Sequence, residues 1–228
     1  MAVLPGSPPV DVELRRSARA RRFSLRVSRL DGRVTLSLPL AAREAEAIRF
    51  LHAQEDWLRA ALARMPGMAV VGIGSALPVE GQLLTLVSGS GRSPRREDDS
   101  LILPGDPSRA GVRAAAFLKV LARDRLVAAC DLHAGRLGRT FGKLSLRDTR
   151  SRWGSCTSDG GLMFSWRLIM APPAVLDYVA AHEVAHLAQM NHSPAFWALV
   201  QGLCPGYGAH RAWLRGQGQS LHGYRFGD

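Results

Sequence analysis

The sequence predicts an α+β fold, in which an antiparallel β-rich N-terminal region with one helix precedes a domain of helices around a small sheet. Three observations lead to this prediction. Apolar and polar residues alternate over residues 12–38, helix formers run from residue 108 to residue 137, and the pair Pro172-Pro173 opens another apolar helical pattern. We place the boundary after Pro107, which gives a region of residues 1–107 and a domain of residues 108–228.

The first strands are expected to be antiparallel, with one buried face and a hairpin turn at Asp31-Gly32. The apolar residues of the buried face are Phe23, Leu25, Val27, Val34, Leu36 and Leu38. Arginines crowd the first part of this segment, and they form either a solvated outer face or a binding patch: Arg15, Arg16, Arg19, Arg21, Arg22, Arg26 and Arg29.

A helix and a second β segment should complete the N-terminal region. Residues 41–65 are helix formers throughout, with Leu51 and either Trp57 or Leu58 at helical spacing, and Pro66-Gly67 should end the helix. Residues 77–87 and 100–103 are strand-like, and the charged, turn-rich residues 88–99 between them predict an exposed hairpin loop.

The C-terminal domain should begin with a long helix over residues 108–137 that Ser108 caps. Residues 143–146 and 162–169 are expected to form a hairpin, and the prolines at 172 and 173 suit the first turn of the next helix. Ser193-Pro194 is a typical start for a further helix. A short helix over residues 207–215 and a loosely structured tail should follow.

The helix that starts at Pro172-Pro173 carries the sequence HEVAH, with His182, Glu183 and His186 in the HExxH pattern. Two imidazoles four residues apart lie on one face of a helix and can bind the same Zn²⁺ ion. The glutamate beside the first histidine can act on a zinc-activated water. We therefore predict a metal site for one zinc ion, with Glu183 as the catalytic residue.

A catalytic zinc needs a third protein ligand, and the sequence restricts the choice. No glutamate follows Glu183, and the only later carboxylate side chain is that of Asp228. The candidates that remain are His192, Cys204, His210 and His222. We favour His192, because it follows His186 at the spacing of the longer zincin motif, although Gln189 replaces the glycine of that motif. The helix should then end near Met190 and Asn191.

Composition and charge narrow the setting of this site. The chain has 228 residues, is 46% hydrophobic and has neither a secretory signal pattern nor an apolar stretch of about 18 residues, so we expect a cytoplasmic protein with no membrane segment. Three widely spaced cysteines without a CxxC pair are expected to be mostly buried thiols. The net charge of +11 comes from 28 Arg and two Lys, which favours anionic partners unless it reflects codon bias alone.

Residues 150–200 resemble the YgjP-like metallopeptidase family, a relative of the SprT-like zincins. The matching segments are SRWGSC, SWRLIMAPP and the block from HEVAH to NHSP, preceded by the arginine-rich N-terminal strands in the same order. The resemblance covers most of the chain, so both regions should form one family-length unit. It implies a zinc-dependent hydrolase with His182, His186 and His192 as ligands and Glu183 as acid/base.

The leading hypothesis is hydrolysis of peptide bonds. One alternative is phosphoanhydride hydrolysis of a nucleoside triphosphate, in which arginines neutralise the phosphates. Another is a nucleic-acid-associated protease held by the basic N-terminal region. Candidates for binding substrate or stabilising an oxyanion are Arg150, Arg152 and Tyr207, although the two arginines could equally pair with Asp148 and Asp159.

Overall fold

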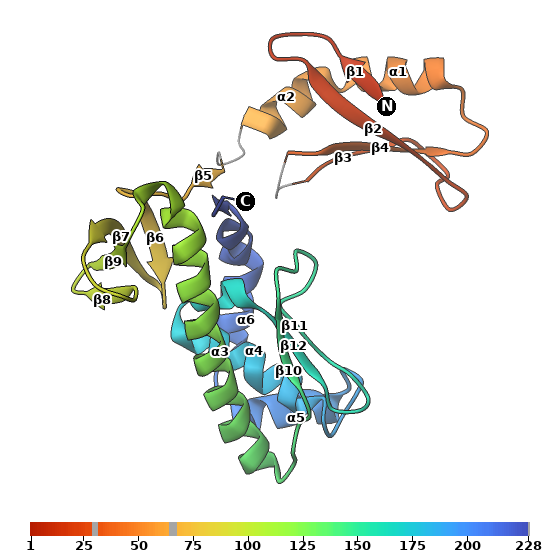
Figure 1. Cartoon of the computed structure of the whole chain (residues 1–228). Coiled ribbons are helices and arrows are strands. Elements are labelled where there is room, and N and C mark those ends of the chain that lie inside the picture. The colour runs from red at the N-terminus through yellow and green to blue at the C-terminus, as the bar shows by residue number, and fades with distance from the viewer. Residues whose placement is uncertain (29–31, 64–67, 228) are drawn as a thin grey trace. The chain divides into compact units, whose positions relative to one another are not determined.

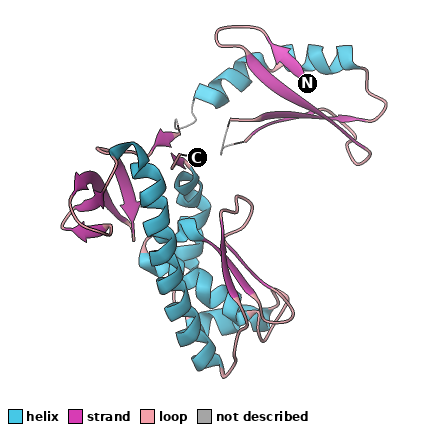
Figure 2. Ribbon diagram, in the orientation of Figure 1, coloured by secondary structure: helices cyan, strands magenta, loops and turns pink. Residues whose placement is uncertain are grey.

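The computed structural model describes residues 1–28, 32–63 and 68–227, and it has the expected α+β class (Figures 1 and 2). The chain forms two compact units, Met1–Met68 and Ala69–Asp228. This division lies about 40 residues before the boundary expected after Pro107, because the second β segment packs with the C-terminal helices. Within the described residues, no helix combines the length and the apolar character that a membrane crossing requires.

The first unit is one mixed sheet with two helices. The strands lie in the order β1-β2-β4-β3, and only β2 and β4 pair in parallel. The expected antiparallel arrangement is therefore right for β3 and β4 but wrong for β2 and β4, because residues 18–23 carry the chain across to the far side of β4. The elements are β1 (Ala2–Leu4), β2 (Val10–Ser17), β3 (Ser24–Val27), β4 (Val34–Pro39), α1 (Glu44–Ala53) and α2 (Glu55–Ala63).

The core of this unit follows the predicted alternation. Val34, Leu36 and Leu38 are at most 1% exposed, and the inward residues of β3 pack against the same cluster. The expected single helix is broken at Gln54, where the acidic residues Glu55 and Asp56 start a new helix. Leu58, and not Trp57, faces the core. The turn at Asp31-Gly32 and the stop at Pro66-Gly67 lie partly or wholly outside the described residues.

The exposed arginines of this unit include one with a structural role. Arg16 donates to the backbone oxygens of Leu40 and Ala42, each at 2.8 Å, and so holds the end of β4. This bond explains one arginine of the predicted basic face and leaves the role of the others open.

The second unit starts with a sheet that differs from the expected hairpin. Its strands lie in the order β6-β7-β9-β8, with β7 and β9 parallel and β8 antiparallel to β9. The predicted exposed loop thus contains a strand of its own, which turns back through Asp98 at φ +46°. The strands are β6 (Ala76–Val79), β7 (Gln82–Gly89), β8 (Arg95–Glu97) and β9 (Ser100–Pro104).

The helix α3 (Ala110–Leu137) connects the parts of this unit. With 28 residues it is about 42 Å long. It packs against β9, β10 (Leu144–Arg147) and the helix that carries the HExxH motif (Figure 1). A 3₁₀ turn, η1 (Pro107–Arg109), precedes it, and the carboxylate of Asp106 accepts a hydrogen bond from the Ser108 amide at 2.9 Å. Asp106 is therefore the side-chain cap of η1, and the prediction that Ser108 caps the long helix is wrong, because α3 begins after Arg109 without a side-chain cap. Gly138, with φ +64°, ends the helix.

A second small sheet supports the predicted metal site. Its strands β10 (Leu144–Arg147), β12 (Leu162–Ser165) and β11 (Gly154–Cys156) lie in that order. The expected hairpin partner of β10 pairs with it in parallel instead, and the antiparallel partner of β12 is β11. The elements that follow are η2 (Trp166–Met170), α4 (Pro173–Ala185), α5 (Pro194–Leu203), α6 (Tyr207–Gln217) and η3 (Gly218–His222).

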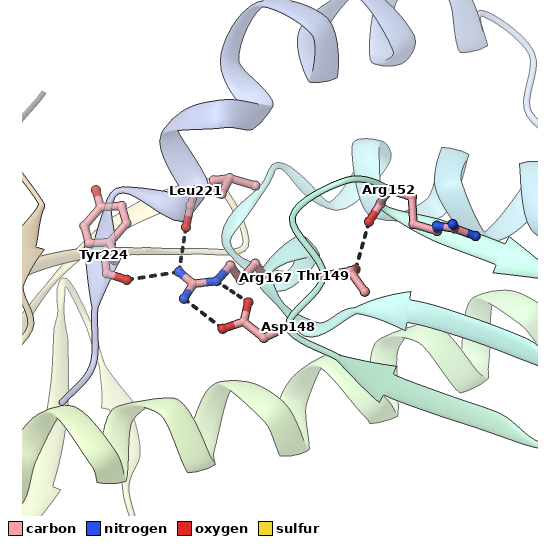
Figure 3. A network of polar contacts seen from close by, with 6 residues as sticks. All are labelled: Asp148, Thr149, Arg152, Arg167, Leu221 and Tyr224. Atoms are coloured by element: carbon pink, nitrogen blue, oxygen red, sulfur yellow. Dashed lines mark hydrogen bonds and ion pairs between the residues drawn. The ribbon is translucent and has the colours of Figure 1, made fainter. Parts of the chain in front are cut away.

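The C-terminal segment is ordered, contrary to the expected loose tail. Strand β13 (Tyr224–Arg225) pairs in parallel with β5 (Ala69–Val70), and Leu221, His222 and Phe226 are buried. Arg167 of η2 holds this segment: its guanidinium donates to the backbone oxygens of Leu221 and Tyr224 at 2.9 and 3.1 Å (Figure 3). A buried arginine therefore connects the sheet of the site to the end of the chain.

Candidate metal centre

Apolar packing positions helix α4, because most of its side chains are buried. Pro173 opens its first turn, as predicted. His182 and Glu183 lie in the last turn of α4, and His186 is the C-terminal cap with helical backbone angles (φ −66°, ψ −18°). The helix ends earlier than the expected Met190 and Asn191, and among the described residues no asparagine adopts a positive φ.

The turn after α4 brings His192 back to the helix. Nδ1 of His186 lies 2.9 Å from the backbone oxygen of Gln189. Because a carbonyl oxygen only accepts, this bond places the proton on Nδ1 and leaves the lone pair on Nε2. The side chain of Ser193 then accepts from the amide of Phe196 and starts α5, as predicted. His192 is thus held between two fixed helix ends.

The three imidazoles converge on one point. One ring nitrogen of each of His182, His186 and His192 lies within 4.8 Å of the others, so together they could hold a metal ion. The Nε2 atoms of His182 and His192 are 3.1 Å apart. Two nitrogen ligands of a tetrahedral zinc lie about 3.3 Å from each other, given Zn–N distances of about 2.0 Å. The spacing of His182 and His192 is close to this value, and three imidazoles are a donor set that suits zinc.

The protonation of these histidines also suits a metal site. Burial, followed by the nearby His186, His192 and Arg211, lowers the pKa of His182 to about 3. Burial also lowers the pKa of His186, against the effect of its hydrogen bond to Gln189. Both imidazoles are neutral at pH 7, and a metal ion binds the neutral form without competition from a proton.

Glu183 lies beside the histidines in a confined position. It is only 6% exposed, and burial raises the pKa of its carboxyl to about 7, against the opposing charge of Arg152. Strand β11 packs over it: a Cβ at Gly154 would lie 2.6 Å from both Cγ and Oε1 of Glu183. A carboxyl with a pKa near neutrality can accept and return a proton at physiological pH.

Aromatic side chains line the side of the centre formed by α5 and α6. Phe196 is fully buried, and its ring centroid lies 4.4 to 4.9 Å from those of all three histidines. Trp197 stacks on His192 at 5.7 Å and on Tyr207 at 5.3 Å. Tyr207 also stacks on Tyr178 at 6.0 Å. These contacts fix the orientation of the imidazoles.

The other candidate ligands lie elsewhere or play other parts. His222 stacks on Trp153 at 5.1 Å, and Cys204 is buried near Asp177. Among the described residues, the one group of His, Cys, Asp and Glu able to hold a metal is the predicted histidine triplet. All three cysteines are free thiols, of which Cys130 and Cys204 are buried.

The predicted substrate residues are only partly brought to the centre. Arg152 is exposed and close enough to lower the pKa of Glu183, and Tyr207 lies in the aromatic wall. The main partner of Asp148 is Arg167, and not Arg150 or Arg152. Arg167 binds its two oxygens at 2.6 and 3.0 Å (Figure 3), while Arg150 adds only a weaker charge effect on its pKa. Asp159 is hydrogen-bonded to Thr157.

Sequence reasoning missed four residues around the site: Gly154, Phe196, Trp197 and Arg211. The guanidinium carbon of Arg211 lies 4.6 Å from the centroid of the Trp197 ring. A signal for this arginine exists in the sequence. It follows Tyr207 by four residues on one helical face, in a stretch without any carboxylate side chain.

Comparison with known proteins identifies the family. The model of the YgjP-like metallopeptidase domain matches residues 21–217. This chain belongs to the YgjP-like metallopeptidase family. Its match to the YgjP-like model includes the three histidines, Glu183 and the strands around them.

One solved structure is also similar to this YgjP-like chain: the crystal structure of the metallopeptidase zymogen of Pyrococcus abyssi abylysin. It has 22% sequence identity and a TM-score of 0.34, and the similarity covers 41% of this chain and 93% of that one. No curated protein matches the chain.

Proposed function

We propose that the protein is a zinc-dependent metallopeptidase, in which His182, His186 and His192 hold the ion and Glu183 is the general base. The observation that carries this proposal is the convergence of three imidazole nitrogens within 4.8 Å beside a buried carboxyl. The chemistry of the donor set supports zinc, since it takes three imidazoles in catalytic sites. Membership of a metallopeptidase family supports the reaction class.

A zinc ion bound there would supply Lewis-acid activation of a water molecule and of the scissile carbonyl. The chain's own residues do the rest. Glu183 accepts a proton from the attacking water and returns it to the leaving amine, for which a pKa near 7 is well suited. Gly154 leaves room for the carboxylate arm of Glu183 in the position that this transfer requires. Phe196 and Trp197 exclude water from one side of the imidazoles.

A second candidate function is phosphoanhydride hydrolysis of a nucleotide by the same centre. Two positively charged side chains near the centre favour it. Arg211 is close enough to lower the pKa of His182, and Arg152 is close enough to lower that of Glu183. Arginine is well suited to neutralise phosphate charge. The nucleic-acid-associated alternative stays a prediction.

The test compares the zinc-loaded protein with its Glu183→Gln variant on casein and, separately, on a panel of nucleoside triphosphates. Because Glu183 is proposed to act on water and not on the ion, the variant should keep one zinc per chain and its fold. Its hydrolysis should be lower by several orders of magnitude. Zinc loss in the variant would make Glu183 a ligand. Zinc-dependent release of phosphate or pyrophosphate, without casein cleavage, would replace the peptidase by a nucleotide hydrolase.

A further inference from the structure

Arg211 lies close to the histidines but has no role in holding them. It projects from α6 onto Trp197, with its guanidinium carbon 4.6 Å from the ring centroid. The Trp197 ring lies 5.6 Å from the ring of His182 and 5.7 Å from that of His192. One aromatic ring therefore separates the guanidinium from the predicted metal ligands.

The guanidinium keeps its hydrogen-bonding capacity. The contact with the Trp197 ring leaves available the N–H donors that point away from this ring. Across the described part of the chain, Arg211 has no hydrogen bond and no ion pair. It is also only partly exposed, so water cannot reach it from every side. Its donors are left for a group that is not part of this chain.

The two helices that carry Arg211 and Trp197 contain no negatively charged side chain. Between Glu183 and Asp228 the sequence has no Asp or Glu, so α5 and α6 carry no carboxylate at all. A partly buried cation without a counter-ion is unfavourable, and an anion bound there would relieve the cost.

The position of Arg211 is also fixed in advance. Tyr207, one turn earlier on α6, stacks on Trp197 with an interplanar angle of 16°. Gly206, at φ +79°, sets the start of the helix that carries both residues. An arginine held by stacking loses less conformational entropy on binding than a free one. These are the properties of a recognition residue.

We propose that Arg211 binds an oxyanion of the substrate, a carboxylate or a phosphate, beside the bond that is cleaved, and so determines a preference for anionic substrates. This inference deepens the proposed hydrolytic function and rests on it for the position of the cleaved bond. The planar fork of the guanidinium matches the two oxygens of either anion.

The first experiment measures binding without turnover. Succinate and inorganic phosphate are titrated calorimetrically into the zinc-loaded full-length protein, into Arg211→Gln and into Arg215→Gln. Arg215 is the matched control, because it is an exposed arginine one turn further along the same helix. Loss of a charge-assisted hydrogen bond should weaken the preferred anion at least about tenfold in Arg211→Gln and less than about twofold in Arg215→Gln. The anion that binds more tightly identifies the source of the oxyanion.

The second experiment measures preference during turnover. Peptides with Glu or Gln at each of three positions on either side of the cleaved bond are compared by their kcat/KM values. The ratio for Glu over Gln at the best position should fall toward one in Arg211→Gln through a rise in KM, and should be unchanged in Arg215→Gln. Arg211→Lys, which keeps the charge but not the fork, should recover part of the ratio.

Three results would overturn the inference: neither anion binds, both variants lose binding equally, or Arg211→Gln changes neither binding nor the ratio. The proposed peptidase function is tested separately, by whether any peptide is cleaved. If no peptide is cleaved but binding of an anion still depends on Arg211, the peptidase proposal is wrong and the recognition role of Arg211 stands.

Discussion

At the scale of single residues, the centre depends on the return of the chain after α4. Two imidazoles on one helix could hold an ion only weakly, and the third comes from a turn fixed by the cap of α5. His192 is exposed, whereas His186 is buried, so the ligand that completes the site is also the one nearest to solvent. Its loss should therefore affect metal binding more than folding.

Replacing His192 with Ala removes one of three nitrogen ligands. We expect zinc affinity to fall by more than about 100-fold, so that the content after dialysis drops from near one ion per chain to almost none. His210→Ala and His222→Ala serve as controls and should keep a content near one. Metal analysis of the three variants checks this. A requirement for His210 or His222 instead would show that the spacing argument has failed.

Gly154→Ala tests the packing of β11 on Glu183. The added methyl group would overlap the carboxylate arm, which must then move. A displacement of about 1 Å can reduce a rate by about 100-fold, so we expect a lower kcat with zinc content unchanged. Gly202→Ala, a helical position with open space around it, is the control and should be nearly silent. An active Gly154→Ala enzyme would mean that Glu183 needs no such confinement.

The sequence predicted the residues that act through local spacing and missed those that act through tertiary contact. HExxH places two imidazoles by helix geometry alone, and the interval to His192 follows a known turn. Phe196, Trp197 and Arg211 carry no such spacing to the motif, because their role depends on how α5 and α6 pack against α4. Gly154 was invisible for the same reason: its neighbour Glu183 is 29 positions away.

At the scale of elements, Arg167 connects the start of the loop before β11 to the C-terminal segment. It binds Asp148 at the end of β10 and two carbonyl groups of the C-terminal segment, while Thr149 closes the loop by donating to the Arg152 oxygen at 2.8 Å (Figure 3). Burial raises the pKa of Asp148, but the hydrogen bond and charge of Arg167 outweigh it and lower the pKa overall. The loop that carries Arg152 is thus held by Arg167 at Asp148 and by the bond of Thr149 to Arg152.

His222 stacks on Trp153 beside this network, and its titration should make the free energy of unfolding depend on pH. Burial and the charge of Arg167 lower its pKa from 6.5 to about 4, against the opposing charge of Asp148. The unfolded chain therefore takes up this proton below pH 6.5, while the folded chain does so only near pH 4. The free energy of unfolding must fall as pH drops through this window.

In His222→Phe the ring stack is kept and the titration is lost. We expect the fall in unfolding free energy between pH 6.5 and pH 4.5 to be smaller by about 1–2 kcal/mol than in the parent. Urea unfolding of the metal-free proteins, followed by tryptophan fluorescence, measures this. His52→Phe, at an exposed histidine, is the control. An identical pH slope in His222→Phe would contradict the argument.

The elements were predicted better than their pairing. Most helices and strands occur where the pattern placed them, because periodicity and capping are local. The parallel pairs β2–β4, β7–β9 and β10–β12 were all missed. For β7–β9 and β10–β12 a turn-rich connection indicated a hairpin, and in all three pairs another strand lies between the two partners along the chain.

At the scale of the whole molecule, each unit has its own apolar core. Leu36, Leu51 and Leu58 belong to one cluster, and Leu118, Phe164 and Phe196 to the other. The predicted boundary after Pro107 cut through the second cluster, because composition alone does not show which core the strands β6 to β9 complete. The division between Met68 and Ala69 is therefore the one to test by experiment.

A fragment that starts at Ala69 should fold and bind zinc without the first unit, since it contains the larger core and all three histidines. We expect a cooperative unfolding transition and one zinc per chain, measured by circular dichroism and metal analysis. A fragment that starts at residue 108, the boundary expected from the sequence, lacks β5 to β9 and should be unstable. Equal stability of the two fragments would refute this division.

The pairing of β5 with β13 has a consequence for the connectivity of the second unit. Ala69 lies opposite Tyr224 and Val70 opposite Arg225, so the unit begins and finishes at the same place. Its two ends could be joined by a short peptide and the chain reopened in the exposed turn near Gly91, which would give a circular permutant with every core contact retained. In such a protein the order of the segments changes while the histidines keep their positions.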